Sequence, residues 1–211
     1  MLRFIAFILF LFPLTALAQN CAPGILKGEL LQRNEADQAA RKRLSAEPQS
    51  KDALDQALQI DRDNTAYLRK MLADCGWPKR SEIGEQAAKS AWRMTQHADM
   101  DPQYQVLAAQ QLKYAVLGGE AEAWDLAVLV DRNRRLTNQL QVYGMQSMTL
   151  PDKTIRFYDI VTPSQLDARR KEIGLTSFYC WTLQLSRQSK GASLEWPTGV
   201  LFAPQDCPEA K

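Results

Sequence analysis

Residues 121–135 read AEAWDLAVLVDRNRR, and this stretch decides the fold. Its apolar residues between Ala123 and Val130 lie on nearly all sides of a helix, which is typical of a helix buried at the centre of a bundle. Asp131 follows Ala127 by four residues and Trp124 by seven, so it shares their face. A carboxylate on a buried face needs a cation or several hydrogen-bond donors. The stretch therefore predicts a central helix that carries a charged group into the core.

Apolar residues spaced three and four apart predict four helices before this one. The expected ranges are about 25–44, 52–73, 81–98 and 102–117. Ser81 and Asp101 are the expected N-caps of the third and fourth of these helices. The apolar set of the fourth helix includes Leu107 and Leu112. Short connections between such helices make consecutive helices antiparallel neighbours.

After Asn138 the pattern changes to β-branched and aromatic residues around Pro151-Asp152, which favours a β-hairpin at about 140–161. A short helix over 163–173, a further helix over 176–188 and an extended proline-containing tail are expected to follow. The predicted fold is mainly α: an antiparallel helical bundle with a small β-hairpin after the fifth helix, stapled by disulfides.

The chain begins with one charge, Arg3, an apolar run over 4–12 and Ala16-Leu17-Ala18. This pattern is typical of a secretory signal peptide over residues 1–18, cleaved after Ala18. The alternative is an N-terminal membrane anchor, for which the apolar run is short. We expect a helical domain at 19–178, a C-terminal extension at 179–211, and a periplasmic or secreted bacterial protein with no further membrane span.

Four cysteines follow the predicted signal peptide: Cys21, Cys75, Cys180 and Cys207. An even number in an exported protein indicates two disulfides, although free thiols in a core are the alternative. Of the three possible pairings, Cys21–Cys75 with Cys180–Cys207 is favoured, because each bridge then joins a terminal segment to a nearby helix. No cysteine spacing resembles a zinc site, and no metal or cofactor is expected.

The formal net charge of the whole chain is +2, and loss of Arg3 with the signal peptide would leave +1. A nearly neutral surface gives no electrostatic basis for binding nucleic acid or an anionic membrane. Motifs for an activated serine, a phosphate loop and a zinc protease are absent from the sequence.

The predicted topology gathers polar residues at one end of the bundle. The third and fifth helices both end there, and the chain then enters the hairpin. The residues expected at this end are His97, Asp99, Asp131, Arg132, Gln141, Tyr143 and Gln146. Trp77 and Pro78 belong at the opposite end.

The polar end has two kinds of candidate roles. As a catalytic site, His97 would act as a general base oriented by Asp99 or Asp131, with Arg132 and Tyr143 stabilising an anion. As a ligand site, the polar contacts would come from Gln96, Asp99, Gln141, Gln146 and Arg169. The structural alternative makes His97 a helix cap. In that alternative Asp131 forms an internal ion pair, with Arg135, Arg169 or Arg170, that fixes how the hairpin docks.

Several short motifs follow one another along residues 30 to 178. They are Gly76-Trp77-Pro78 with Ile83-Gly84, Gln96-His97-Ala98-Asp99, Asp131-Arg132, Gln141-x-Tyr143-Gly144-x-Gln146, and Asp167-x-Arg169-Arg170 with Gly174-Leu175. In this order they resemble a family of bacterial proteins known as a domain of unknown function, family 6624. The resemblance implies a shared polar motif and brings no activity with it.

Two features depart from the family pattern. Met145 stands where the family usually has a small hydroxyl residue, and the segment from Cys180 to Cys207 lies outside the pattern. The sequence thus leaves three hypotheses. The chain is a binding module for a small polar or anionic ligand or for an envelope protein, or a metal-independent hydrolase or transferase, or its polar residues are purely structural.

Overall fold

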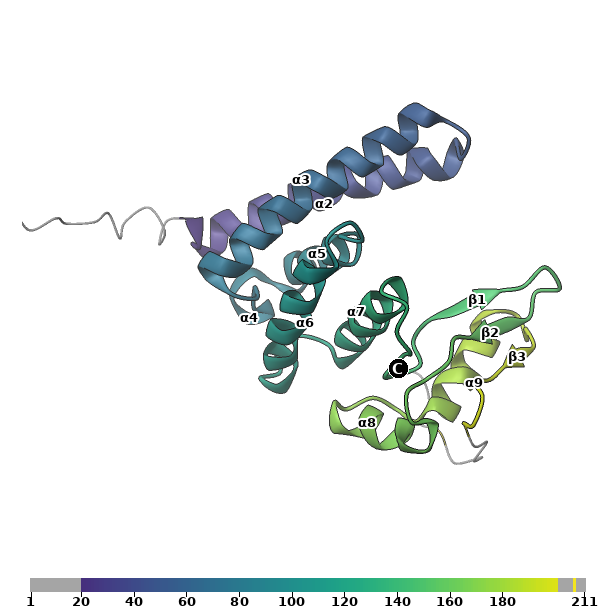
Figure 1. The fold of residues 1–211 in the computed structure, drawn as a ribbon. Helices are drawn as coiled ribbons and strands as arrows, with labels where there is room; N and C mark the ends of the chain where they lie inside the picture. The colour runs from purple at the N-terminus through teal and green to yellow at the C-terminus, as the bar shows by residue number, and fades with distance from the viewer. Residues whose placement is uncertain (1–19, 201–206, 208–211) are drawn as a thin grey trace, which may run out of the picture.

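The computed structural model describes residues 20–200 and residue 207. The predicted signal peptide and the last prolines of the tail, Pro204 and Pro208, lie outside these residues. Within them the chain is mainly helical with a small sheet, which confirms the predicted fold class. Figure 1 shows the helices of the bundle followed by the sheet and two further helices at the other end of the molecule.

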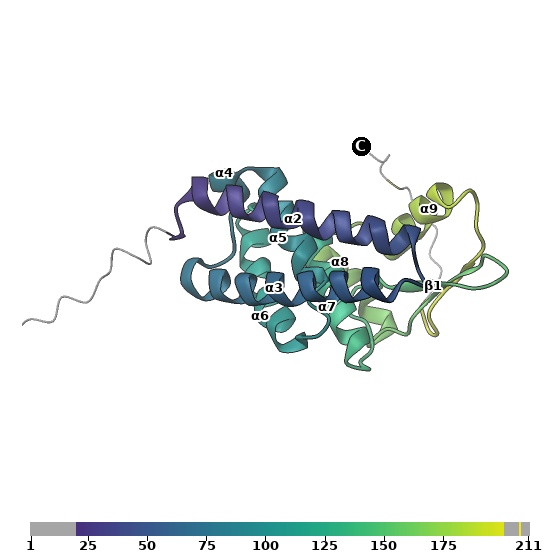
Figure 2. The same cartoon turned by 90° about the horizontal axis from the view of Figure 1, so that it is seen from above.

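Two long helices form one side of the bundle. They are α2 (Pro23–Ala46) and α3 (Lys51–Cys75), and they run side by side in both views (Figures 1 and 2). Ser50 begins α3, because its hydroxyl oxygen accepts a hydrogen bond from the Ala53 N–H at 3.2 Å. Both helices match the ranges that their apolar spacing predicts.

The third predicted helix is divided in two by Gly84. A short α4 (Arg80–Ile83) precedes α5 (Glu85–Gln96), and Gly84 between them has a φ of +83°. The prediction of Ser81 as the N-cap was wrong, because Ser81 lies inside α4 and its hydroxyl donates to Glu120 at 2.8 Å. A glycine at positive φ interrupts helical hydrogen bonding, and periodicity alone does not reveal this.

The fourth and fifth predicted helices are α6 (Pro102–Leu117) and α7 (Ala123–Leu136). Asp101 caps α6, as expected, by accepting from the Tyr104 N–H at 3.0 Å. Two residues expected in the core lie outside it: Trp124 is 40% exposed and Leu107 is 48% exposed. Trp124 belongs to the first turn of α7, at the edge of the bundle. Its ring packs at a tilt against that of Trp92, with 5.5 Å between the ring centroids.

The predicted hairpin consists of β1 (Ser147–Thr149) and β2 (Ile155–Phe157), paired antiparallel with Met148 opposite Arg156. A third strand, β3 (Leu194–Glu195), adds to β2 in parallel. The sequence did not indicate β3, because two residues are too few to show an alternating pattern.

The chain between β2 and β3 contains a 3₁₀ turn, η1 (Pro163–Gln165), then α8 (Leu166–Glu172) and α9 (Phe178–Gln188). These helices match the predicted ranges. The predicted boundary between residues 178 and 179 falls at the first residue of α9 and stays a prediction.

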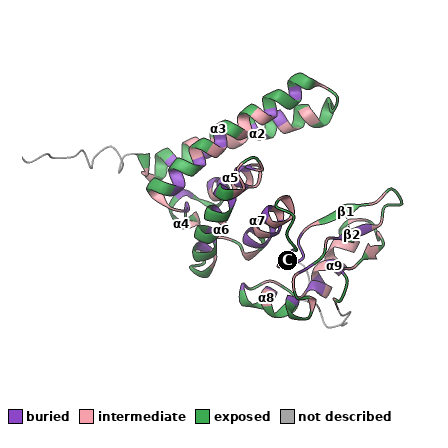
Figure 3. Ribbon diagram, in the orientation of Figure 1, coloured by how far each residue is buried: buried purple, intermediate pink, exposed green. Residues whose placement is uncertain are grey.

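The apolar side chains form two cores. The larger lies among α2 to α7 and includes Met145, whereas the smaller joins β2, α8 and α9 through Phe157, Leu166 and Phe178. Figure 3 shows the buried residues on the sides of the helices that face one another, while the far end of the α2–α3 pair is mostly exposed. The segment 141–146 connects the two cores.

Both favoured disulfides are confirmed. Cys21–Cys75 joins the start of α2 to the end of α3, and Cys180–Cys207 joins α9 to the tail. Among the described residues, no helix is long and apolar enough to cross a membrane.

Gly144 allows a test of how closely the two cores pack. It has a φ of +74°, and a Cβ at this position would lie 2.7 Å from Cε2 of Phe178. Gly119 has nearly the same φ, +73°, but nothing lies within 4 Å of its Cβ position. Alanine at either site has the cost of left-handed backbone, about 1–2 kcal/mol, and at Gly144 an added steric cost of about 1–3 kcal/mol.

We therefore expect Gly144→Ala to lower the free energy of unfolding clearly more than Gly119→Ala, measured by urea denaturation. Equal losses in the two variants would contradict close packing of Phe178 on this loop.

Candidate functional site

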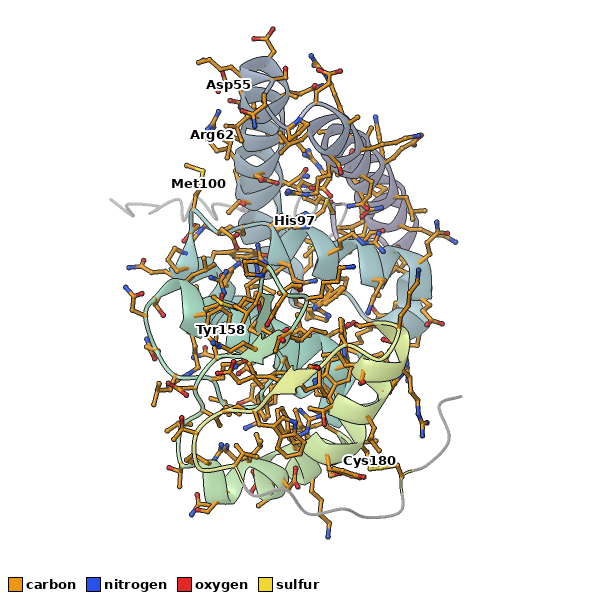
Figure 4. The ribbon with its side chains drawn as sticks, turned by 90° about the vertical axis from the view of Figure 1, so that its right-hand side faces the viewer. Asp55, Arg62, His97, Met100, Tyr158 and Cys180 are labelled. Carbon is orange, nitrogen blue, oxygen red and sulfur yellow. A yellow bond between two sulfur atoms is a disulfide. The ribbon has the colours of Figure 1, made fainter. Side chains whose placement is uncertain are left out.

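The corner between α5 and α6 carries the only histidine of the chain. His97 is the C-cap of α5, and Asp101, four residues on, caps α6. Figure 4 shows His97 where the α2–α3 pair meets the rest of the molecule. Helix ends that meet in this way bring side chains from several helices to one place.

The hydrogen-bond partners of His97 come from α2, and one of them connects it to α3. Its Nδ1 lies 2.9 Å from Oδ1 of Asp37 and 2.8 Å from Nε of Arg41. Arg41 also donates to Asp37 at 3.2 Å and forms an ion pair with Asp61. The group Asp37, Arg41, Asp61 and His97 is hereafter the His97 cluster.

Burial and charge act against each other in this cluster. Burial by itself would raise the pKa of the Asp37 carboxyl, but His97, Gln38 and Arg41 outweigh it and lower that pKa below its usual value. For Asp61 burial prevails over the charge of Arg41 and raises the pKa. Asp37 is 1% exposed, so its ionised form depends on these partners.

Asp99 and Arg132 form a second group beside this corner. Nε of Arg132 donates to Asp99 at 2.9 Å, and Gln105 donates from its amide to Asp99 at 3.3 Å and to the backbone oxygen of Gln96 at 3.3 Å. Arg132 therefore pairs with Asp99, which the sequence analysis predicted as a residue that orients His97.

The carboxylate of Asp131 binds the backbone of the segment 141–146. It accepts from the N–H groups of Val142 at 2.7 Å, Tyr143 at 3.1 Å and Met145 at 2.8 Å. Burial raises the pKa of the Asp131 carboxyl, and these three N–H donors act against the rise. Asp131 is 0% exposed, so its bonds hold the segment onto α7.

Gln141 closes the same segment on itself. Its side-chain oxygen accepts from the Gln146 N–H at 2.6 Å, and its amide donates to the carbonyls of Gln146 at 3.0 Å and Tyr158 at 2.8 Å. The predicted ligand-binding role of Gln141 would compete with these contacts.

The two arginines of α8 hold the other side of the segment. Arg169 donates to the carbonyls of Val142 and Val161, at 3.0 and 2.6 Å. Arg170, 1% exposed, donates to the carbonyls of Tyr143 and Thr176.

Burial lowers the pKa of Arg170 to about 10, with Asp167 and Asp131 acting against the shift. Nη1 of Arg170 also lies 3.4 Å from the sulfur of Met145. Met145 therefore takes part in this packing.

The structure thus divides the predicted polar end into three groups. His97 contacts α2, and Asp99 pairs with Arg132 beside Gln96. The network around the segment 141–146 contains Asp131, Gln141, Tyr143, Gln146 and Arg169. His97 contacts Asp37, a residue that the sequence analysis did not predict for this site. A signal existed, because Asp37 continues the spacing of Leu30, Ala40 and Leu44 along α2.

A pocket of about 530 Å³ lies beside the N-terminal halves of α5 and α7. Trp77, Trp92 and Leu112 supply apolar surface. The charged lining residues are Arg80, Lys89, Arg93, Glu85, Glu120, Glu122 and Asp125. None of the predicted site residues lines this pocket. It lies toward the end where the sequence placed Trp77, away from the predicted polar end.

The charges of the pocket are unequally partnered. Lys89 forms an ion pair with Asp125 and lies 4.0 Å from the ring centroid of Trp92. Burial raises the pKa of Asp125, and Lys89 acts against that rise. Among the described residues, the guanidinium of Arg93 has one hydrogen bond, 3.0 Å to Asn34 of α2, and no ion pair. Arg93 therefore keeps donors for another group.

Comparison with known proteins gives one family. The sequence model of a family of unknown function (DUF6624) matches residues 24–190. No curated protein and no solved structure matches the chain.

Neighbouring residues of α7 allow the structural role of Asp131 to be tested. Asp131→Asn replaces one acceptor oxygen with an NH₂ group that faces a buried backbone N–H, so we expect a loss of about 3 kcal/mol in the free energy of unfolding. Arg132→Gln breaks only a partly exposed ion pair with Asp99, so its loss should be about 1 kcal/mol or less.

Urea denaturation followed by circular dichroism measures both values. A stability of Asp131→Asn as high as that of Arg132→Gln would contradict the structural role.

Proposed function

The chain belongs to the DUF6624 family of unknown function, and we propose that it is a binding protein for a small ligand that combines an anionic group with an apolar body. The observation that carries this proposal is that Arg93 lines one pocket together with Trp77 and Trp92 and forms no ion pair among the described residues, whereas Lys89 is paired with Asp125. A pocket of this size with apolar walls beside polar groups that fix orientation is typical of small-molecule sites.

Arg93 supplies the specificity for charge. A guanidinium offers a planar set of N–H donors that fits a carboxylate or phosphate with two parallel hydrogen bonds. Asn34 holds one of its nitrogens and fixes the side chain against α2. Since Lys89 is already paired with Asp125 and Arg80 with Glu122, Arg93 is the cation of the pocket lining best suited to an incoming anion.

The tryptophans supply the site for the apolar body. Trp77 and Trp92 are 7% and 6% exposed, so their accessible edges form a firm wall and not a mobile surface. The indole N–H of Trp92 donates to the backbone oxygen of Asp125 at 2.9 Å, which fixes the ring. A fixed wall lowers the entropy cost of binding.

Catalysis at His97 has less support. Its Nδ1 already faces both Asp37 and Arg41, and His97 does not line the pocket. A general base must reach a proton of the bound substrate, and the pocket does not bring a substrate to this imidazole.

We place the protein outside the cytoplasm, in the periplasm or secreted. The described cysteines form two disulfides, and disulfides persist in oxidising compartments. The predicted signal peptide agrees with this location, where small anionic solutes are available to a binding protein.

Matched pairs of small acids and amides test the proposal. We expect phenylacetate and indole-3-acetate to bind at least about tenfold more tightly than phenylacetamide and indole-3-acetamide, because a charge-assisted bond to Arg93 adds about 1.5–3 kcal/mol. Saturation-transfer NMR with titration measures these affinities.

Arg93→Gln should remove the preference for the acids and leave the affinity for the amides nearly unchanged. Arg43→Gln is the matched control, since Arg43 is an exposed arginine of α2 outside the pocket lining. Equal binding of acid and amide by the wild type, or an acid preference that survives in Arg93→Gln, would refute the proposed pocket.

A further inference from the structure

We propose that Asp37, Asp61 and His97 form a binding site for a divalent transition-metal ion such as Zn²⁺. The three residues come from α2, α3 and the end of α5, and one donor atom of each lies within 4.8 Å of the others. The site is separate from the pocket that contains Arg93.

The chemistry of the donors fits this class of ion. One imidazole and two carboxylates are ligands that Zn²⁺ accepts, with distances of about 2.0–2.2 Å to nitrogen and oxygen. Two neighbouring ligand atoms around a tetrahedral ion at these distances lie roughly 3.3–3.6 Å apart. Nδ1 of His97 and Oδ1 of Asp37 are separated by 2.9 Å, so a separation of only about 0.5 Å more brings them to the spacing of two adjacent ligands.

The hydrogen bonds of His97 leave a conflict that a metal ion resolves. If Nδ1 carries a proton, it donates to Asp37 and faces an N–H of Arg41. If Nδ1 is bare, it accepts from Arg41, and its lone pair then faces the oxygen of Asp37 at 2.9 Å. One nitrogen cannot satisfy both partners. A cation between Nδ1 and Oδ1 uses both lone pairs at once.

Arg41 acts as the competing cation. Its Nε–H points to both Asp37 and His97, and its Nη2 donates to Asp61, so the guanidinium and a metal ion share the same three acceptors. The side chain of Arg41 is 31% exposed, whereas that of Asp37 is 1% exposed. Arg41 can therefore turn outward while the carboxylate stays in place.

Three helices hold the donors in position before an ion binds. Asp37 is fixed by Gln38, whose amide donates to its other oxygen at 2.7 Å, and His97 is fixed by its place as the C-cap of α5. Preorganised ligands of this kind favour binding, because little freedom is lost.

The rest of the chain offers few competing ligands for Zn²⁺. His97 is the only histidine in the sequence, and the structure shows no free cysteine among the residues it describes. Strong binding by an untagged chain with intact disulfides would therefore point to this cluster.

Isothermal titration of the untagged chain with ZnCl₂ tests the proposal. We expect saturable binding of one ion per chain. His97→Gln and Asp37→Asn should each weaken it by at least about tenfold, since even the loss of an outer partner costs 10–100-fold in known sites. Arg41→Gln should bind more tightly than the wild type, because it removes the competing cation.

Asp63→Asn is the matched control, because Asp63 lies on α3 two residues after Asp61, accepts from Gln59 at the surface, and should leave the affinity unchanged. A second measurement needs no variant: Co²⁺ added to the wild type should shift and broaden the NMR signals of the single imidazole at one equivalent.

The absence of saturable Zn²⁺ binding by the wild type would overturn the proposal. So would Zn²⁺ binding that leaves the imidazole signals unshifted, or equal affinities of the wild type and a folded His97→Gln variant. Loss of arylacetate binding in these variants is not expected, so failure of the metal site and failure of the proposed pocket are separate results.

Discussion

The bond between the carboxylate of Asp131 and the segment 141–146 holds the two halves of the molecule together. This carboxylate is fully buried on α7, in the larger core, and it accepts three backbone N–H groups from the chain that leads to the sheet. A buried carboxylate is stable only when its lone pairs are satisfied, so the segment has to take one conformation. Gly144 permits that conformation and lets Phe178 of the smaller core approach the backbone. Arg170 reaches the same segment from α8. The residues around Asp131 thus form a junction between the two cores.

The sequence predicted the helices well because their apolar faces repeat over many residues. The ranges of α2, α3, α6 and α7 follow from spacing, and the start of α6 also follows from the cap Asp101. Prediction failed where a single residue or a very short element decides the structure. Gly84 divides one helix into two, and β3 is too short to show a pattern. Helical spacing places Trp124 on the same face as Asp131. However, Trp124 lies at the N-terminal end of α7, where the neighbouring helices no longer cover it.

The candidate site was harder to predict than the fold, because contacts between helices depend on how the helices cross. Topology alone placed His97 and Asp131 at one end of the bundle, but it did not say which faces meet. In the structure α2 and α3 lie over the corner with His97. The carboxylate beside His97 is therefore Asp37 of α2, and not Asp99 or Asp131 as the sequence predicted. Asp37 was visible only as a carboxylate on an apolar face of α2. Asp37 on α2 and Asp131 on α7 are both buried carboxylates, and burying either of them has a similar cost.

The pocket and the His97 cluster are connected through the interface between α2 and α5. Arg93 contacts Asn34, and one turn further along both helices His97 contacts Asp37. These two contacts are successive links between the same pair of helices. Both links depend on the packing of α2 against α5, but each uses its own side chains. Removing one link therefore leaves the other in place, so the packing of these two helices positions two sites that bind independently.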